Sequence, residues 1–260
     1  MAIDLFTVGP FTVHGYGLMI GIGFVLAVLI GGYRTKKLGL SEDDFTNISI
    51  CVLLFGWMGG KIMFIIVNFR QFLISPMSTL GSEGFVVYGG IITGILSIFV
   101  YCKIKKLSFL TYMDMMAPAV AINQGLGRVG CFMAGCCYGK PTDSWFGVVF
   151  PENSLAPAGI RLIPTQLISA LFDILLAVFL ILITRKVKYR GMVSGIYLLM
   201  YGVGRFIIEI FRDDKDRGMV GILSTSQFIS IFMVIFAVCY LYFVNKNQPA
   251  TEYTLPADDK

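Results

Sequence analysis

The sequence predicts an all-α integral membrane protein with seven transmembrane helices, an amino terminus outside the cell and a carboxyl terminus in the cytoplasm. Composition and apolar segment length predict the fold class. Of the 260 residues, 56% are hydrophobic and 14% are charged, and the mean hydropathy is +0.78. A soluble domain is usually about 45–50% apolar and about 25% charged. A bilayer is therefore the solvent that suits this chain.

Seven apolar segments account for the predicted helices. A helix needs about 20 mainly apolar residues to cross about 30 Å of hydrocarbon. One of the seven, the segment 110–137, is interrupted by polar residues such as Asp114 and Arg128. We expect it to pack inside the bundle, where protein or water can satisfy a polar backbone, with a break or re-entrant turn near its end as an alternative. The other six lie at 15–32, 47–67, 85–102, 165–184, 192–211 and 222–244.

Basic residues between the segments predict the orientation. They gather in alternate loops, at 34–37, 103–106 and 185–190. The positive-inside rule places these loops in the cytoplasm. The net charge of +5 does not indicate nucleic-acid binding, because the basic residues sit in short clusters between apolar runs, which is the pattern of a membrane protein. The first ten residues lack the basic region of a signal peptide, so the first segment is expected to be a retained span.

We expect one seven-helix transmembrane domain over residues 1–247. A polar cytoplasmic tail follows at 248–260 and is expected to be disordered. The longest external loop, 138–164, contains four prolines. This loop is expected either to cap the bundle or to lie on the membrane surface.

Charged side chains within the spans are the main indicators of function, because each costs about 2.5–3.5 kcal/mol or more at the bilayer centre. The predicted orientation places Lys61, Arg128 and Arg205 toward the outer half of the membrane. Together they indicate an anionic ligand that approaches from the outer leaflet. Arg128 stands among glycines, and its planar fork of donors suits a phosphodiester.

Structural roles for these charges remain open alternatives. Lys61 can extend its apolar stem along the helix and act only as an anchor. Arg205 and Glu209 are four residues apart and can form an ion pair on one helical face. Asp173 can neutralise one of the arginines.

Three cysteines form a cluster at the end of the segment 110–137: Cys131, Cys136 and Cys137. Four interpretations are open: small packing residues, a disulfide or redox pair on an oxidising face, a covalent nucleophile at Cys131, or a zinc site. The spacing does not favour zinc, because it lacks paired Cys-x-x-Cys ligands and because His14 is distant in sequence. We therefore expect no metal here.

Several motifs resemble those of the prolipoprotein diacylglyceryl transferase family. The segment 125–139 reads Gly-Leu-Gly-Arg-Val-Gly-Cys-Phe-Met-Ala-Gly-Cys-Cys-Tyr-Gly and is similar to the family's Gly-Arg-x-Gly signature. The segment 201–212 resembles its Tyr-x-x-x-Arg-x-x-x-Glu-x-x-Arg run. Shorter similarities follow the same order along the chain, at His14–Met19, Gly59–Lys61, Tyr88–Gly90 and Pro164–Leu167.

The resemblance implies a bacterial cytoplasmic-membrane enzyme with an active site toward the outer leaflet. The family moves the diacylglyceryl group of phosphatidylglycerol onto the thiol of a lipobox cysteine in an exported prolipoprotein. Glycerol phosphate leaves. The implied partners are phosphatidylglycerol, the lipobox peptide and membrane lipids, with no nucleic acid and no cofactor.

The resemblance also implies roles for particular residues. Arg128 binds the donor phosphate, and Arg205 shares that load or stabilises the departing phosphate, with Glu209 orienting Arg205. Tyr88 completes the catalytic set, at the position of the family's histidine. Glycines from 125 to 139 are expected to bring backbone amides to the headgroup. The implied substrate-binding residues are Tyr16, Lys61, Gly130, Cys131, Gly139, Tyr201 and Arg212.

Departures from the family pattern keep other functions open, and they include Ala134–Cys136 in place of the family's Asn-x-Glu and Ile163 in place of a histidine. Tyr88 replaces a candidate general base, and a phenol with a pKa near 10 is a poor base at neutral pH. Cys131 replaces an asparagine. A transferase of the same fold with another acceptor, an anion transporter and a non-catalytic lipid-binding paralogue are the alternatives.

Overall fold

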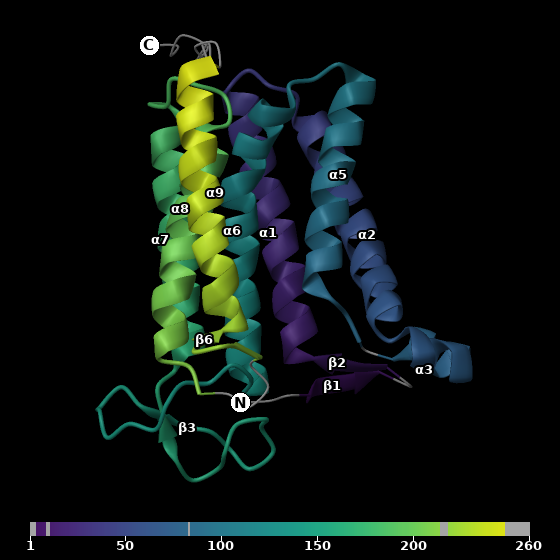
Figure 1. Cartoon of the computed structure of the whole chain (residues 1–260), viewed down its shortest axis with the longest axis vertical. Helices are drawn as coiled ribbons and strands as arrows, with labels where there is room; N and C mark the ends of the chain where they lie inside the picture. Colours follow the sequence, from purple (N-terminus) through teal and green to yellow (C-terminus); the bar gives the residue numbers. More distant parts are fainter. Residues whose placement is uncertain (1–3, 9–10, 83, 214–217, 248–260) are drawn as a thin grey trace.

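The computed structural model describes residues 4–8, 11–82, 84–213 and 218–247, with side chains from His14 onward. Long helices form a bundle (Figure 1), and the order of elements agrees with the predicted segments. The long helices are α1 (Gly15–Lys37), α2 (Glu42–Val67), α5 (Val87–Lys105), α6 (Phe109–Ala134), α7 (Thr165–Thr184), α8 (Met192–Ile210) and α9 (Thr225–Asn247). The short elements are β1 (Asp4–Val8), β2 (Phe11–His14), α3 (Phe69–Ile74), α4 (Pro76–Gly81), β3 (Val148–Val149), β4 (Arg161–Leu162), β5 (Met219–Val220) and β6 (Leu223–Ser224).

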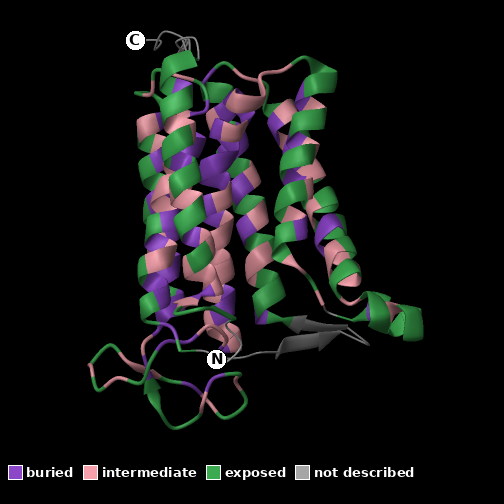
Figure 2. Ribbon diagram, viewed as in Figure 1, coloured by how far each residue is buried: buried purple, intermediate pink, exposed green. Residues whose placement is uncertain are grey.

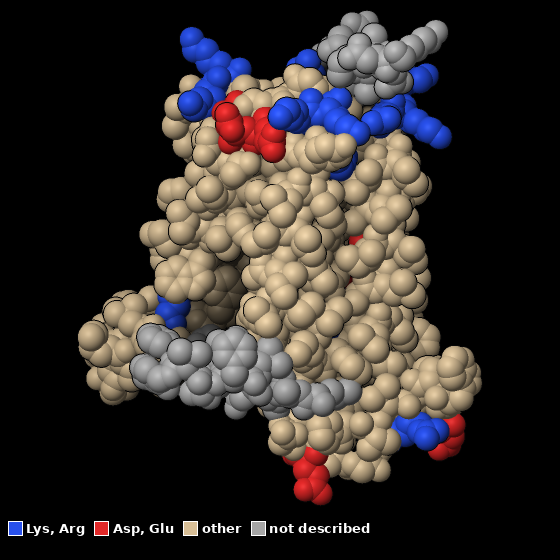
Figure 3. Space-filling model, turned by 180° about the vertical axis from the view of Figure 1, so that it is seen from behind, with Lys and Arg blue, Asp and Glu red and all other residues tan. Residues whose placement is uncertain are grey.

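Within the described residues, six helices are long and apolar enough to cross a membrane: α1, α2, α5, α7, α8 and α9. The fold class, an all-helical membrane protein, is therefore confirmed. Exposed green residues cover much of the outer faces of these helices (Figure 2), and many of them are large and apolar. Charged residues gather mainly at the two ends of the molecule (Figure 3).

Helix α6 is more polar and packs inside the bundle as expected. It lies chiefly against α1 and α7, and 13 of its 26 residues are buried. The alternative, a break or re-entrant turn near its end, is not seen. Helix α6 continues through Pro118 to Ala134 and then stops at Gly135, whose φ of 75° favours a residue without a side chain. The predicted segment therefore ends three residues too late.

Helix ends carry the charges and caps that stabilise them. Ser41 caps α2 by accepting a hydrogen bond from the Asp44 amide at 3.1 Å, and Glu42 to Asp44 complement the helix dipole. Basic residues occupy the last turn of α1. At the start of α8, the buried Asp114 carboxylate accepts bonds from the amides of Gly191 and Ser194, at 2.7 and 2.8 Å. Asp114 thus ties α6 to the first turn of α8.

Helices α2 and α5 form a pair that diverges from the other helices toward the end that carries β1 and β2 (Figure 1). The pair packs closely because Gly59 and Gly89 face each other without side chains. At the opposite end, Phe45 and Ile98 join the pair to α6 through a shared hydrophobic core. A hollow opens in the space-filling surface on the diverging side (Figure 3).

The segment between α6 and α7 folds at the same end as the β1–β2 hairpin (Figure 1). Strands β3 and β4 pair within it, and Tyr138, Phe150, Ala156 and Leu162 form a small core of their own. The two expectations for 138–164, a cap on the bundle and a segment on the membrane surface, both stay predictions. The hairpins were not anticipated. The predicted tail at 248–260 lies outside the described residues.

Candidate active site

A small cavity lies among α6, α7 and α8. Its position brings together charges that are widely separated in sequence. Two arginines, one carboxylate and one phenol face it, together with a hydroxyl and two apolar side chains. The lining residues are Arg128, Ser169, Phe172, Asp173, Tyr201, Arg205 and Ile208.

Arg128 is the cation without a direct protein partner in this cavity. Among the residues that the structure describes, it makes no hydrogen bond or ion pair, although Asp173 and Tyr201 are close enough to interact with it electrostatically. Asp173 is almost fully buried and also interacts electrostatically with Arg205. A guanidinium at membrane depth is costly unless it is paired or solvated. The donors of Arg128 therefore face the cavity without a partner among the described residues.

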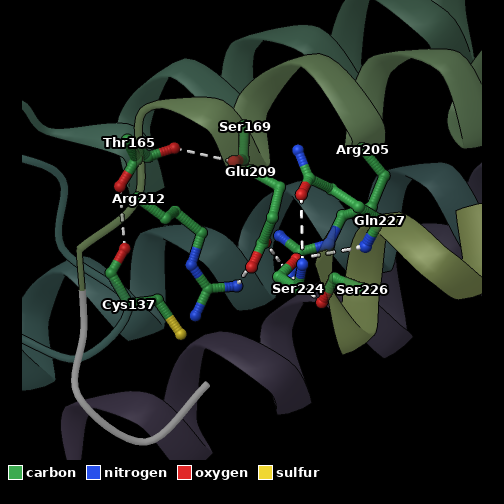
Figure 4. Close-up of polar contacts among 9 residues, drawn as sticks. All are labelled: Cys137, Thr165, Ser169, Arg205, Glu209, Arg212, Ser224, Ser226 and Gln227. Carbon is green, nitrogen blue, oxygen red and sulfur yellow. Dashed lines mark hydrogen bonds and ion pairs between the residues drawn. The ribbon is translucent and has the colours of Figure 1, made fainter. Parts of the chain in front are cut away.

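Arg205 on α8 and Arg212, two residues after the end of α8, share the carboxylate of Glu209 (Figure 4). Glu209 Oε2 lies 2.8 Å from Arg205 Nη2 and 3.3 Å from Arg212 Nη1. The side chains are 14%, 0% and 9% exposed for Arg205, Glu209 and Arg212. The ion pair expected from the four-residue spacing of Arg205 and Glu209 is therefore confirmed. Glu209 holds one guanidinium at the cavity and the other beside it.

Helix α9 fixes the other side of Arg205. Its first turn is closed by a reciprocal cap in which Ser224 Oγ accepts from the Gln227 amide and Gln227 Oε1 accepts from the Ser224 amide, at 3.2 and 3.1 Å. This turn presents Ser226, whose Oγ accepts a bond from Arg205 Nη2 at 2.8 Å (Figure 4). The sequence analysis missed Ser226, because a single serine in a separate span gives no signal of its own.

The start of α7 holds the segment that follows α6. Thr165 Oγ1 donates to the Cys137 carbonyl and Gln166 Nε2 donates to the Cys136 carbonyl, both at 2.7 Å. Gly139 forms a backbone bridge with Arg212. These contacts give the Pro164–Leu167 motif a physical role that its resemblance alone did not define: it positions the cysteine segment beside the arginines.

Three tyrosines were predicted for the site: Tyr201 lines the cavity, and the other two lie near this cluster. Tyr88, on α5, is half exposed and lies within electrostatic reach of Arg205 and Tyr201. Tyr16, on α1, lies within reach of Arg128 and the three clustered cysteines. The fold therefore brings residues from α1, α5, α6 and α8 to one region, as the resemblance implied.

Lys61 is placed elsewhere. Its ammonium group donates to the carbonyls of Ser82 and Gly84, at 2.5 and 3.4 Å, in the segment before α5. It also lies over the ring of Phe64. These contacts match the anchoring alternative, and Lys61 is not among the residues that line the cavity.

The glycines around Arg128 mostly face protein and not open space. A side chain at Gly130 would meet the backbone of Tyr16 at 3.1 Å, and one at Gly139 would meet the Ile163 carbonyl at 2.7 Å. Gly127 has only ordinary contact with Ile20. The expectation that these glycines expose amides to a ligand therefore needs correction at Gly130 and Gly139, where they permit close packing.

Long apolar helices that enclose a cavity lined by two arginines and a carboxylate define a membrane protein with a charged site inside its helical bundle. Comparison with known proteins narrows this class. A family model described as prolipoprotein diacylglyceryl transferase matches residues 4–243. The chain belongs to this family.

Three relatives with this activity in their names align with almost the full length of the chain. The chain is 45% identical over 236 residues to a phosphatidylglycerol–prolipoprotein diacylglyceryl transferase of Clostridium tetani, covering 90% of this chain and 94% of that protein. It is 42% identical over 255 residues to phosphatidylglycerol–prolipoprotein diacylglyceryl transferase 2 of Clostridium perfringens, covering 97% and 98%. A Clostridium botulinum enzyme of the same name is 30% identical over 249 residues, covering 94% and 97%.

Proposed function

We propose that this protein transfers the diacylglyceryl group of phosphatidylglycerol to the thiol of a lipobox cysteine in a prolipoprotein. The family match and the relatives' names support a transferase with this activity. The observation that carries the chemistry is Arg128, a cation in an internal cavity with no direct partner among the described residues.

Arg128 binds the phosphodiester of the donor lipid in this proposal. The acceptor sulfur attacks the glyceryl carbon next to that phosphate, and the carbon–oxygen bond breaks. Negative charge then grows on the departing glycerol phosphate. Arg205, held by Glu209 and Ser226, is oriented to stabilise that charge before the reaction starts. Preoriented donors of this kind are effective because they need no rearrangement during the reaction.

The donor enters from the outer leaflet in this scheme. Helix α6 also spans the membrane, as the fourth of seven spans along the chain. The basic loops at 34–37, 103–106 and 185–190 face the cytoplasm. The β1–β2 hairpin and the end of α9 lie at opposite ends of the bundle (Figure 1), which suits an odd number of spans. Arg128, Arg205 and Glu209 lie in the later halves of α6 and α8. These halves are then in the outer part of the membrane.

A thiol-lipidation assay tests the proposal. Purified protein is incubated with phosphatidylglycerol carrying labelled acyl chains and a lipobox peptide, and label on the peptide cysteine is measured. Arg128→Ala should lower transfer by about 10²–10³-fold, the usual effect of removing one preoriented donor. Arg128→Lys should also be impaired, because a point charge does not reproduce the planar fork.

Arg185→Ala is the matched control, because Arg185 is an exposed arginine at the end of α7. It should transfer at the wild-type rate. Wild-type turnover in Arg128→Ala would refute the phosphate-binding role. Binding of phosphatidylglycerol without transfer to any lipobox peptide would instead favour a lipid-binding protein.

A further inference from the structure

The thiols of Cys131, Cys136 and Cys137 form a compact group that the proposed mechanism does not use. Their sulfur atoms all lie within 4.8 Å of one another. All six cysteines of the chain fall within the described residues and are free thiols. Cys131 is buried, and the other two are partly buried. The group therefore has the arrangement of a set of three metal ligands.

The end of α6 builds this group. The Cys136 amide donates to the Cys131 carbonyl at 3.1 Å, and the Gly135 amide donates to the Phe132 carbonyl at 3.2 Å. This pair of bonds is a Schellman motif, which folds the chain back over the last helical turn and brings residue 136 onto residue 131. This capping motif alone explains why the thiols of Cys131 and Cys136 lie close together. It does not explain the third.

Cys137 joins the group through an unfavourable backbone conformation. Its φ is 61°, a left-handed value that costs a non-glycine residue on the order of 1 kcal/mol or more. The two bonds from Thr165 and Gln166 to the carbonyls of residues 137 and 136 hold the segment in place. Contacts from another helix thus maintain a conformation that turns the third thiol toward the other two.

Three thiolates at this separation suit zinc. Zinc–sulfur bonds of about 2.3 Å in a tetrahedral site place the sulfurs roughly 3.8 Å apart. Side-chain rotations that move the sulfur atoms by about 1 Å bring the three thiols to this separation. Three thiolates and one Zn²⁺ carry a net charge of −1. Arg128 and Arg212 are close enough to act electrostatically on this group. Arg212 is already paired with Glu209, so Arg128 is the cation that balances the net charge of −1.

The fourth zinc position is the important feature. Among the described residues, the cluster of potential metal ligands consists of these three cysteines alone. Structural zinc sites usually have four protein ligands, whereas catalytic sites have three and leave one position for water or substrate. The cluster also lies beside the arginines that the proposed function assigns to the donor phosphate.

We propose that Cys131, Cys136 and Cys137 bind one zinc ion, and that the cysteine thiol of the acceptor peptide occupies its fourth position. This inference rests on the proposed function. Zinc binding converts the acceptor thiol to a thiolate, and the proton passes to solvent. The thiolate forms the new carbon–sulfur bond, the carbon–oxygen bond to phosphate breaks, and glycerol phosphate leaves with that electron pair.

This assignment accounts for the acceptor side of the reaction. A thiol must lose its proton to become a good nucleophile. Tyr88 stands where the family has a histidine, and a phenol is a poor base. A metal that stabilises the thiolate directly removes the need for a basic side chain. Tyr88 is then free to contact the lipid headgroup.

The first experiment measures the metal. The full chain is purified in detergent with zinc present, and bound zinc is determined by mass spectrometry. We expect about one zinc per chain in the wild type and in Cys239→Ser, whose cysteine lies on α9 away from the group. Cys136→Ser and Cys137→Ser should lose most of it. Cadmium-loaded wild type should show a thiolate-to-metal charge-transfer band that both cluster variants lack.

The second experiment uses cobalt(II) in place of zinc. A lipobox peptide should change the visible cobalt bands, and the same peptide with serine for cysteine should not. Zinc removal by a chelator should lower transfer at least about tenfold, with recovery on zinc addition. Phosphatidylglycerol binding should survive in Cys136→Ser, which distinguishes loss of the metal from unfolding.

Several results would overturn the inference. These are zinc content equal in wild type and Cys136→Ser, a native disulfide between clustered cysteines in the active protein, and full transfer by zinc-free protein. In the last case the proposed function stands without the metal. Unchanged cobalt bands with peptide would refute acceptor binding. Metal-bound, peptide-responsive protein without transfer would support the zinc site and contradict the proposed function.

Discussion

Glu209→Gln removes the carboxylate that pairs with two arginines beside the cavity. The substitution keeps the shape of the side chain and one acceptor oxygen, but it eliminates the negative charge. Glu209 is 0% exposed, so water does not replace the lost interaction. Arg205 and Arg212 remain nearby, with their positive charges no longer neutralised by Glu209.

The contact distances define the expected size of the effect. At 2.8 and 3.3 Å, and with an effective dielectric constant near 20, the two attractions are roughly 6 and 5 kcal/mol before desolvation is considered. Desolvation offsets much of this in the intact protein. Removing one member of a buried ion pair typically costs about 3–5 kcal/mol, because the remaining charge is left uncompensated. We expect a loss in this range in the free energy of unfolding.

Glu42→Gln is the matched control. Glu42 pairs with Lys36 at 3.6 Å, but their side chains are 47% and 74% exposed. An exposed pair contributes about 0–1 kcal/mol. The same chemical change should therefore cost less than about 1 kcal/mol at this position.

Unfolding in mixed detergent micelles provides the measurement. The fraction of an unfolding detergent is increased, and helix content is followed by circular dichroism, with a second probe to check two-state behaviour. The difference between the two variants is the informative quantity. If Glu209→Gln costs no more than Glu42→Gln, the buried ion pairs do not stabilise the folded protein and the reasoning fails.

Three further predictions concern packing and chemistry. Gly130→Ala should lower the free energy of unfolding by about 1–3 kcal/mol, because the new methyl group meets the Tyr16 backbone. Gly127→Ala, the control, should be neutral or stabilising. Equal unfolding curves for the two variants would contradict this reasoning. Asp114→Ala should lower the free energy of unfolding by at least about 2 kcal/mol in the same assay, because the amides of Gly191 and Ser194 at the start of α8 lose their acceptor. An unchanged unfolding curve would show that water replaces the carboxylate. Tyr88→Phe should retain transfer within about threefold if the phenol is not the general base; a 10²-fold loss would assign it a proton-transfer role.

The sequence was sufficient for the apolar spans and for the main charged residues of the site. Spans of about 20 apolar residues are local features, so hydropathy located six of the helices within a few residues. Arg205 and Glu209 were found for a similar reason. Charges at membrane depth are rare and costly, and a four-residue spacing places two side chains on one helical face.

Other features depended on contacts between distant segments. Ser226 lies on α9 and holds Arg205 on α8, while Gln166 on α7 holds the carbonyl of Cys136. Neither residue has a local pattern that signals such a role. Lys61 shows the converse, because its position in a span suggested ligand binding but its ammonium group contacts backbone carbonyls before α5.

The cysteines separate the two kinds of information most clearly. Their spacing alone argued against a metal site, because sequence rules for zinc assume ligands placed by paired Cys-x-x-Cys turns. In the folded chain, the capping motif after Ala134 brings residue 136 onto residue 131, and bonds from α7 hold Cys137 in a left-handed conformation. The sequence alone determined which side chains are too polar or too reactive for a bilayer. Only the tertiary structure decided which of them meet, because their contacts are made by backbone geometry and by helices far apart in the chain.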